Sequence, residues 1–147
     1  MSNQEGKAME TKNFKITDYE VVNCERFNPR RSWCSVKVRV MVNGLVKEET
    51  AQGDGPVEAL HRALCLALSQ FSFLGSLDLM GFKVQYPNFK GVASTVKVSA
   101  ACSNNGLRDR WNAQATSPNI VSAYFETVAK LLDQAITRYN AEHNAAG

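Results

Sequence analysis

Hydrophobic and polar residues alternate along several short segments of the chain. Between Ser35 and Val42 every second residue is valine, and Lys37 and Arg39 lie on the opposite face. This period of two predicts a half-buried strand. The same kind of pattern predicts strands over residues 16–24 and 45–52 in the first half, and around 82–86, 96–98 and 111–115 in the second half.

Two other segments carry apolar residues at the helical spacing of three and four. The first begins at Pro56, a residue suited to the first turn of a helix, and places Leu60 and Leu64 on one face. The second follows Ser117 and Pro118. We expect Ser117 to be the N-cap of that helix and Pro118 to be its first residue.

The two halves of the chain resemble each other. After a shift of 62 residues, segment 43–56 matches segment 105–118 at six of 14 positions, including the Asn-Gly pairs Asn43-Gly44 and Asn105-Gly106. Asn-Gly is the strongest short signal for a two-residue hairpin turn. The order of elements is therefore βββα, twice. We predict an α+β fold of two such units related by a pseudo-twofold axis, each with a three-stranded antiparallel sheet covered by a helix.

This organisation predicts one domain over residues 13–140. Its first βββα unit spans 13–71 and its second spans 77–140. The lead at 1–12 is polar and mixed in charge. We expect this lead to be disordered and the tail at 141–147 to be frayed.

Composition excludes several classes of protein. Hydrophobic residues make up 44% of the 147 residues and charged residues 21%, as in ordinary globular domains. The net charge of +3 is not concentrated in the basic stripe that nucleic-acid binding requires. No apolar segment is long enough to span a bilayer, and the first residues lack the apolar core of a signal peptide. We therefore expect a cytoplasmic protein with no membrane or nucleic-acid partner.

Candidate catalytic and metal-binding residues are few. None of the four cysteines belongs to a C-x-x-C pair, and His61 and His143 have no partner at ligand spacing. The H-x-H, H-E-x-x-H and G-x-S-x-G motifs do not occur. We predict no catalytic residue, no metal site and no cofactor. The thiols should be free and buried, and His61 should be a solvated helix residue.

Two loops have a chemistry suited to a ligand. Segments 53–56 and 116–119 occupy equivalent places in the repeat, and each leads into a helix. Backbone N–H groups and the helix dipole at such a point hold a carboxylate, whereas Asp54 can face an ammonium group. A free amino acid carries both charges. Ordinary helix capping accounts for the same residues and remains the alternative.

Three motifs in these regions resemble a known family. Segment 51–60, AQGDGPVEAL, resembles the G-x-G-P-V-[DE]-A motif of the C-terminal regulatory domain of 2-isopropylmalate and citramalate synthases. Segment 79–84 resembles its L-x-x-[YF]-x-V strand, and segment 117–123 resembles its S-x-[DN]-I-[IV]-x-A helix start. The motifs occur in order within residues 14–139. Members of this family fold as two βββα units and dimerise, so the resemblance implies a homodimer.

The resemblance also implies a function. The chain would be a non-catalytic domain that binds leucine or isoleucine near the dimer interface. It would control an acyltransferase barrel, in cis or in trans, that uses acetyl-CoA and a 2-keto acid. By position, the candidate effector-binding residues are Asp54, Gly55, Pro56, Leu79, Phe82, Tyr86, Ser117, Pro118 and Asn119.

Two residues depart from the family pattern: Tyr124 replaces a small serine, and Phe82 stands where tyrosine is frequent. Two alternatives stay open. The first is a self-associating dimerisation scaffold without a ligand. The second is a small RNA-binding module, which only Trp33 and Trp111, each near an arginine, favour.

Overall fold

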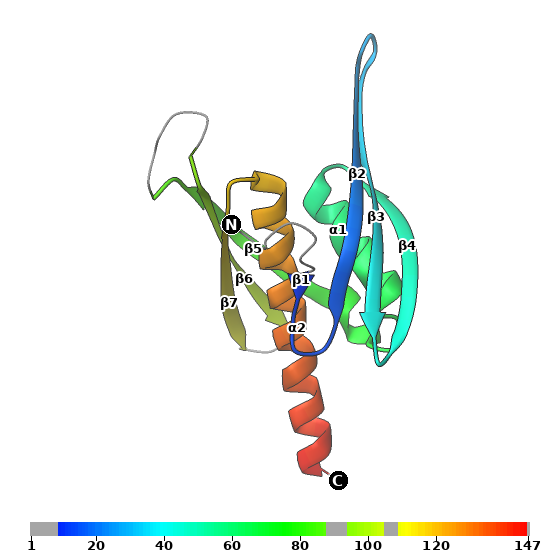
Figure 1. Ribbon diagram of the computed structural model, residues 1–147, viewed down its shortest axis with the longest axis vertical. Coiled ribbons are helices and arrows are strands. Elements are labelled where there is room, and N and C mark those ends of the chain that lie inside the picture. The colour runs from blue at the N-terminus through cyan, green and yellow to red at the C-terminus, as the bar shows by residue number, and fades with distance from the viewer. Residues whose placement is uncertain (1–8, 88–93, 105–108, 147) are drawn as a thin grey trace, which may run out of the picture. The chain divides into compact units, whose positions relative to one another are not determined.

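The computed structural model describes residues 9–87, 94–104 and 109–146, with side chains described up to residue 142 (Figure 1). The chain divides into two compact units between Gly75 and Ser76. Each unit contains an antiparallel sheet and one α-helix, so the structure has the predicted α+β class. The pseudo-twofold axis between the units stays a prediction.

The first unit is built from a four-stranded antiparallel sheet in the order β1-β2-β3-β4. The helix α1 packs against β3 and β4. A short 3-10 helix, η1, ends the unit. The elements are β1 (Met9–Glu10), β2 (Lys15–Phe27), β3 (Arg30–Val42), β4 (Leu45–Gly53), α1 (Pro56–Ala67) and η1 (Ser72–Ser76).

The second unit is built from a three-stranded antiparallel sheet in the order β5-β6-β7. The long helix α2 packs against β6 and β7. The elements are β5 (Leu77–Gln85), β6 (Val96–Asn104), β7 (Arg110–Ser117) and α2 (Ile120–Ala146).

The apolar alternation read from the sequence places the core of each unit. The valines of β3 that share one face are buried, and α1 covers them with its own buried face, which includes Leu60 and Leu64. In the second unit the buried Trp111 donates its Nε1–H to the Leu131 carbonyl, 3.0 Å away. Thr127, also buried, donates to the Ala123 carbonyl at 2.7 Å. Polar atoms in the second core are thereby satisfied.

Each helix also covers carbonyl groups of the edge strand beside it. Arg62 of α1 donates to the Gln52 carbonyl of β4 at 2.9 Å. In the second unit Lys130 donates to the Gln114 carbonyl of β7 at 2.8 Å, and Gln134 donates to the Asn112 carbonyl at 3.2 Å. Residues 130 and 134 are one helical turn apart, as residues 112 and 114 are one strand period apart, so the two contacts repeat in register.

Several predicted boundaries were wrong. Met9–Glu10 pairs with β2, although it lies in the lead expected to be disordered. The strand expected over residues 16–24 continues to Phe27, which pairs with Arg30 across a two-residue turn. The helix α2 continues to Ala146 through the tail expected to be frayed. In each case a regular element extends further than the apolar pattern that marked its centre.

The repeat is not exact in its strand register. Val36 pairs with Ala51 in the first hairpin, so an offset of 62 predicts that Val98 pairs with Ala113. Val98 pairs with Ala115 instead. The innermost described pair of the second hairpin is Ser103 with Arg110, against Val42 with Leu45 in the first hairpin. The predicted turn at 105–106 lies outside the described residues.

Candidate functional site

The connection from β4 to α1 is held by a glutamate in the first turn of the helix. Gly55 is the N-cap and Pro56 occupies the first turn, as predicted. Glu58 turns back and its Oε1 accepts the Asp54 N–H at 3.0 Å. A Cβ on Gly53 would lie 2.7 Å from the Ala59 nitrogen and 2.9 Å from that same Oε1. Strand and helix therefore approach so closely that only glycine fits at position 53.

Arg62 extends this arrangement by one helical turn. Its Nη2 lies 3.6 Å from Glu58 Oε1, and its Nη1 donates to the Gln52 carbonyl. The sequence analysis did not single out Glu58 and Arg62 as a pair. The signal was present, because a glutamate three residues after an N-cap is one half of a capping box.

Among the residues that the structure describes, no side chain caps the first turn of α1. Gly55 has none to offer, and Glu58 is engaged with Asp54. The Asp54 carboxylate is exposed beside this turn. The start of α1 therefore combines helix N–H groups that lack a side-chain cap within the described residues with an exposed acidic side chain, and the binding of an amino acid there stays a prediction.

The start of α2 has a different chemistry, and the predicted cap there was wrong. Asn119, not Ser117, caps the helix: its Oδ1 accepts the N–H of Val121 at 2.8 Å and of Ser122 at 3.2 Å. The helix begins at Ile120, so Pro118 lies outside it. Ser117 Oγ accepts the Asn119 N–H at 3.1 Å. An asparagine carbonyl reaches the second and third helical N–H groups, and therefore decides the boundary.

The apolar candidates lie in the second unit. Leu79 pairs with Cys102 in the sheet, and a bulge follows between Met80 and Lys83. Gly81 in this bulge has a φ of 66°, a conformation that favours glycine.

Phe82 lies in the same bulge, and its ring centroid is 5.7 Å from that of Tyr124 on α2. Phe82, Val84 and Tyr124 pack against the buried residues Val96, Val98 and Ala123. Tyr86 is 49% exposed. The structure thus brings Phe82 to Tyr124, the residue that departs from the family pattern, and leaves half of Tyr86 in solvent.

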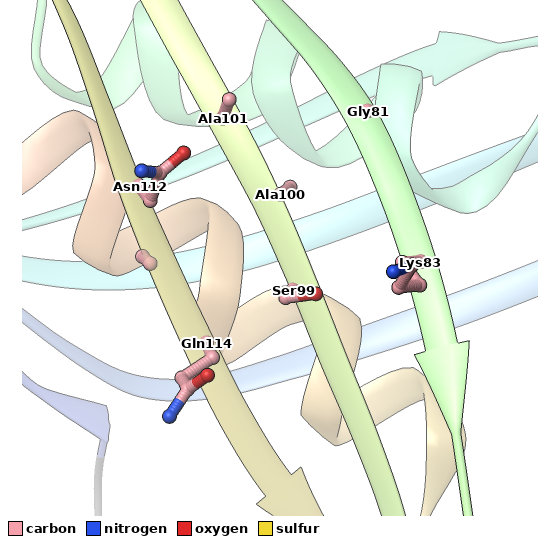
Figure 2. Close-up of a pocket in the computed structure, with 8 residues that line it drawn as sticks. Gly81, Lys83, Ser99, Ala100, Ala101, Asn112 and Gln114 are labelled. Atoms are coloured by element: carbon pink, nitrogen blue, oxygen red, sulfur yellow. The ribbon is translucent and has the colours of Figure 1, made fainter.

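A shallow depression of about 390 Å³ lies on the second sheet (Figure 2). Lys83, Ser99, Asn112 and Gln114 project into it from three strands. It contains none of the nine predicted effector residues. Since Trp111 and Ala115 are buried on the side of α2, Asn112 and Gln114 lie on the opposite, open face. An open sheet face encloses little of a small ligand, so this depression does not define a site for one.

All four cysteines are free, as expected, but only Cys34 and Cys102 are buried, whereas Cys24 and Cys65 are half-buried. Burial raises the pKa of the Cys102 thiol to about 12, and the nearby Asp78 carboxylate adds to the rise. Burial also raises the pKa values of Cys34 and Cys65. Such thiols are poor nucleophiles at neutral pH. Within the described part of the chain, no three His, Cys, Asp or Glu side chains gather to hold a metal ion.

His61 is not the solvated residue that the sequence suggested. Its Nε2 lies 3.0 Å from the Leu74 carbonyl, in a half-buried position. The imidazole therefore links α1 to the 3-10 helix that follows it. This contact accounts for the histidine as a structural residue.

No helix among the described residues is both long and apolar enough to cross a membrane.

The family model of the LeuA allosteric (dimerisation) domain matches residues 1–136. Three curated relatives are (R)-citramalate synthases. The enzyme of Geobacter sulfurreducens is 29% identical over 117 residues, that of Aquifex aeolicus 28% over 111, and that of Synechocystis 34% over 105.

These alignments cover most of the chain but little of the enzymes. They span 78%, 75% and 70% of this chain and 22%, 21% and 19% of the three synthases, in the same order. The chain thus spans about a fifth of the length of these relatives. It corresponds to a small regulatory part, which explains why catalytic motifs are absent from its sequence. The match over residues 1–136 shows that the chain belongs to the LeuA allosteric (dimerisation) domain family.

Proposed function

We propose that this chain is an amino-acid-sensing domain that binds free leucine or isoleucine. In this role it exerts feedback control on an acyltransferase of the citramalate or 2-isopropylmalate synthase type. The observation that carries the proposal is the match of residues 1–136 to an allosteric domain family. The catalytic barrel is supplied elsewhere, in cis or in trans. The free thiols of all four cysteines support a cytoplasmic location.

The start of α1 is the better of the two helix starts for the charged end of the ligand. Its first turn has no side-chain cap, so the N–H groups of Val57 and Glu58 are available for a carboxylate. Asp54 is exposed beside them and suits the ammonium group. At the start of α2 the equivalent N–H groups already bond to Asn119, so Ser117, Pro118 and Asn119 contribute less.

The branched side chain of the ligand needs an apolar surface, and Leu79, Phe82 and Tyr86 are the proposed residues. Phe82 supports this role because it joins the apolar cluster around Val98 without being fully buried. The polar candidates in the first unit are tested by Asp54→Ala, and the apolar candidates in the second unit are tested by Phe82→Ala.

Isothermal titration calorimetry with leucine, isoleucine and glycine tests the proposal. Burying a branched side chain stabilises a complex by about 2–3 kcal/mol, so glycine should bind about 30- to 150-fold more weakly. Asp54→Ala should weaken leucine or isoleucine binding by at least about tenfold, because it removes a charge-assisted contact. Phe82→Ala should also weaken it. Glu20→Gln is the control, since it removes a carboxylate from an exposed position of the first sheet.

Each outcome has a separate meaning. If neither leucine nor isoleucine gives heat at millimolar concentration, the sensing function is wrong and a ligand-free dimerisation scaffold replaces it. If binding occurs but Asp54→Ala matches Glu20→Gln, the function stands and the assignment of the ammonium group is wrong.

The same proposal includes a homodimer, in keeping with the dimerisation role of the family. Sedimentation at micromolar concentration should give twice the chain mass of 16.2 kDa. A monomer, with and without leucine, would contradict it.

A further inference from the structure

The hairpin of β2 and β3 continues beyond the rest of its sheet. The last pair between β3 and β4 is Cys34 with Gly53. Beyond it, residues 24–33 pair only with each other, from Cys24↔Trp33 to Phe27↔Arg30. Figure 1 shows this two-stranded ribbon projecting past β4 and α1. We call residues 24–33 the ribbon. A lone pair of strands is only marginally stable, so the ribbon contributes little to the stability of the first unit.

One face of the ribbon is basic and aromatic. Arg26 and Arg31 are direct cross-strand partners and therefore share a face with Trp33, two residues along β3 from Arg31. The guanidinium carbons of Arg31 and Arg26 lie 4.7 Å and 5.7 Å from the centroid of the Trp33 ring. The indole is thus a platform that orders both guanidinium groups.

The charges on this face differ from those on the same face of the same two strands nearer the sheet. There, Arg39 is opposite Asp18, with Nη1 and Oδ2 3.2 Å apart, and Lys37 is opposite Glu20. In the ribbon two arginines face each other. Like charges directly opposite destabilise a strand pair. In the described part of the chain neither Arg26 nor Arg31 forms an ion pair, whereas Arg30 pairs with Glu25 at 3.1 Å.

We propose that this face of the ribbon is a docking surface for an acidic site on another protein. A carboxylate inserted between Arg26 and Arg31 accepts hydrogen bonds from both guanidinium groups and removes their repulsion. Trp33, half-buried on the same face, supplies the apolar part of this surface. Arginine, tryptophan and other large aromatic residues are the types that dominate the energetics of protein interfaces.

The charge of the ribbon favours a protein partner over a nucleic acid. Affinity for nucleic acid grows with the number of phosphates neutralised, and tight binding uses many such contacts. This face of the ribbon offers two guanidinium groups that form no ion pair in the described part of the chain, too few for the many phosphate contacts of tight nucleic-acid binding. Two guanidinium groups on one indole suit one or two carboxylates presented by a folded surface.

The test measures the binding of poly-L-glutamate, which is the acidic probe. The binding of a single-stranded DNA oligonucleotide of similar charge is measured for comparison and represents nucleic acids. Binding is followed at low salt by the fluorescence of Trp33, whose signal is identified by its loss in Trp33→Phe. Arg26→Gln with Arg31→Gln should weaken polyglutamate binding at least about tenfold. Lys37→Gln is the matched control on the same face and strand, and should change affinity less than about twofold.

A second variant separates docking from a structural role. Arg31→Glu turns the like-charged pair with Arg26 into an opposite-charged one. It should raise the melting temperature by about 1–4 °C and abolish binding of polyglutamate. If Arg31 served only to stabilise the fold, its replacement would lower the melting temperature of the protein.

Three results would overturn the proposal: no polyglutamate binding by the wild-type chain, equal affinities for the double variant and Lys37→Gln, or tighter binding of the DNA than of polyglutamate. The last result would assign the ribbon to nucleic acid instead. None of these measurements depends on leucine or isoleucine binding.

Discussion

Each α-helix follows the last strand of its unit, yet the first turns of the two helices are built with different chemistry. At α1 a glycine cap, a proline and the side chain of Glu58 hold the strand against the helix and leave the first N–H groups without a side-chain cap. At α2 the carbonyl of Asn119 occupies two of those groups. A repeat in element order therefore does not imply a repeat in binding capacity.

This difference concerns the proposed ligand directly. The sequence predicted two equivalent loops, each able to hold a carboxylate. Only the start of α1 keeps that capacity without rearrangement, because a ligand at α2 has to displace the Asn119 side chain. The two units are thus expected to differ in every property that depends on the helix start. Each unit nevertheless contains one sheet, one α-helix and a buried cysteine on an inner strand of its sheet.

The largest expected difference concerns those cysteines, Cys34 on β3 and Cys102 on β6. Because the pKa of Cys102 rises from 9.0 to about 12, its thiolate fraction at pH 8 falls about 1,000-fold relative to the unfolded chain. Alkylation by iodoacetamide, followed by mass spectrometry of peptides, should label Cys102 last of the four. Rapid labelling of Cys102 in the folded protein would show that the second core opens readily.

The same shift has a consequence for stability. A thiol that keeps its proton more strongly when folded stabilises the protein below its unfolded pKa, and this contribution is lost as the pH rises from about 9 toward 12. Thermal unfolding between pH 8 and pH 11 should therefore show a steeper decline for the wild type than for Cys102→Ala.

The next prediction tests the close approach at α1. Gly53→Ala should lower the free energy of unfolding by about 1–3 kcal/mol, because the added Cβ meets the backbone nitrogen of Ala59. Gly75→Ala is the control, since a Cβ there meets no atom within 4 Å and Gly75 caps no α-helix. Urea unfolding of both variants measures the difference. Equal stabilities would mean that the strand and helix adjust to the extra methyl group at no cost.

A smaller effect is expected at α2. Asn119→Ala should cost about 1 kcal/mol, because two helix N–H groups lose their acceptor. Ser117→Ala should cost less, since the serine accepts only the N–H of Asn119 itself. If Ser117→Ala proved the more damaging of the two, the helix would begin where the sequence first placed it.

The smallest effect concerns Glu58. Glu58→Ala should cost about 0.5–1 kcal/mol through the lost bond to the Asp54 N–H and the weak pairing with Arg62. Glu58→Gln keeps an acceptor and should recover most of that loss. Thermal unfolding of the two variants, in low and in high salt, separates the hydrogen bond from the ion pair.

Sequence patterns predicted the centres of the elements well because burial imposes them. The alternation of valines in β3 and the three- and four-residue spacing in α1 follow directly from which side faces a core. The class of fold and the family followed from these patterns and from the motif at 53–59. Asn43-Gly44 correctly marked a two-residue turn, and Asn43 has the positive φ that such a turn requires.

The features that were missed depend on local competition between side chains. Ser117 and Asn119 are both good caps, and only the geometry shows that the asparagine reaches the helix N–H groups. The pairing of Val98 with Ala115 depends on the register between two strands, which the periodicity along one strand does not report. The contact of Phe82 with Tyr124 joins residues 42 positions apart, so no local pattern reveals it.

The contacts from helix side chains to edge-strand carbonyls bear on aggregation. An uncovered edge strand is a template for another strand, and long flat edges are the usual starting points of amyloid-like association. Arg62 occupies such a carbonyl on β4, and Lys130 and Gln134 occupy two on β7. An incoming strand would have to displace these donors before it could extend the first sheet at β4 or the second sheet at β7. Each α-helix therefore shields the edge strand beside it as well as covering the core. Self-association by strand addition is disfavoured at β4 and at β7.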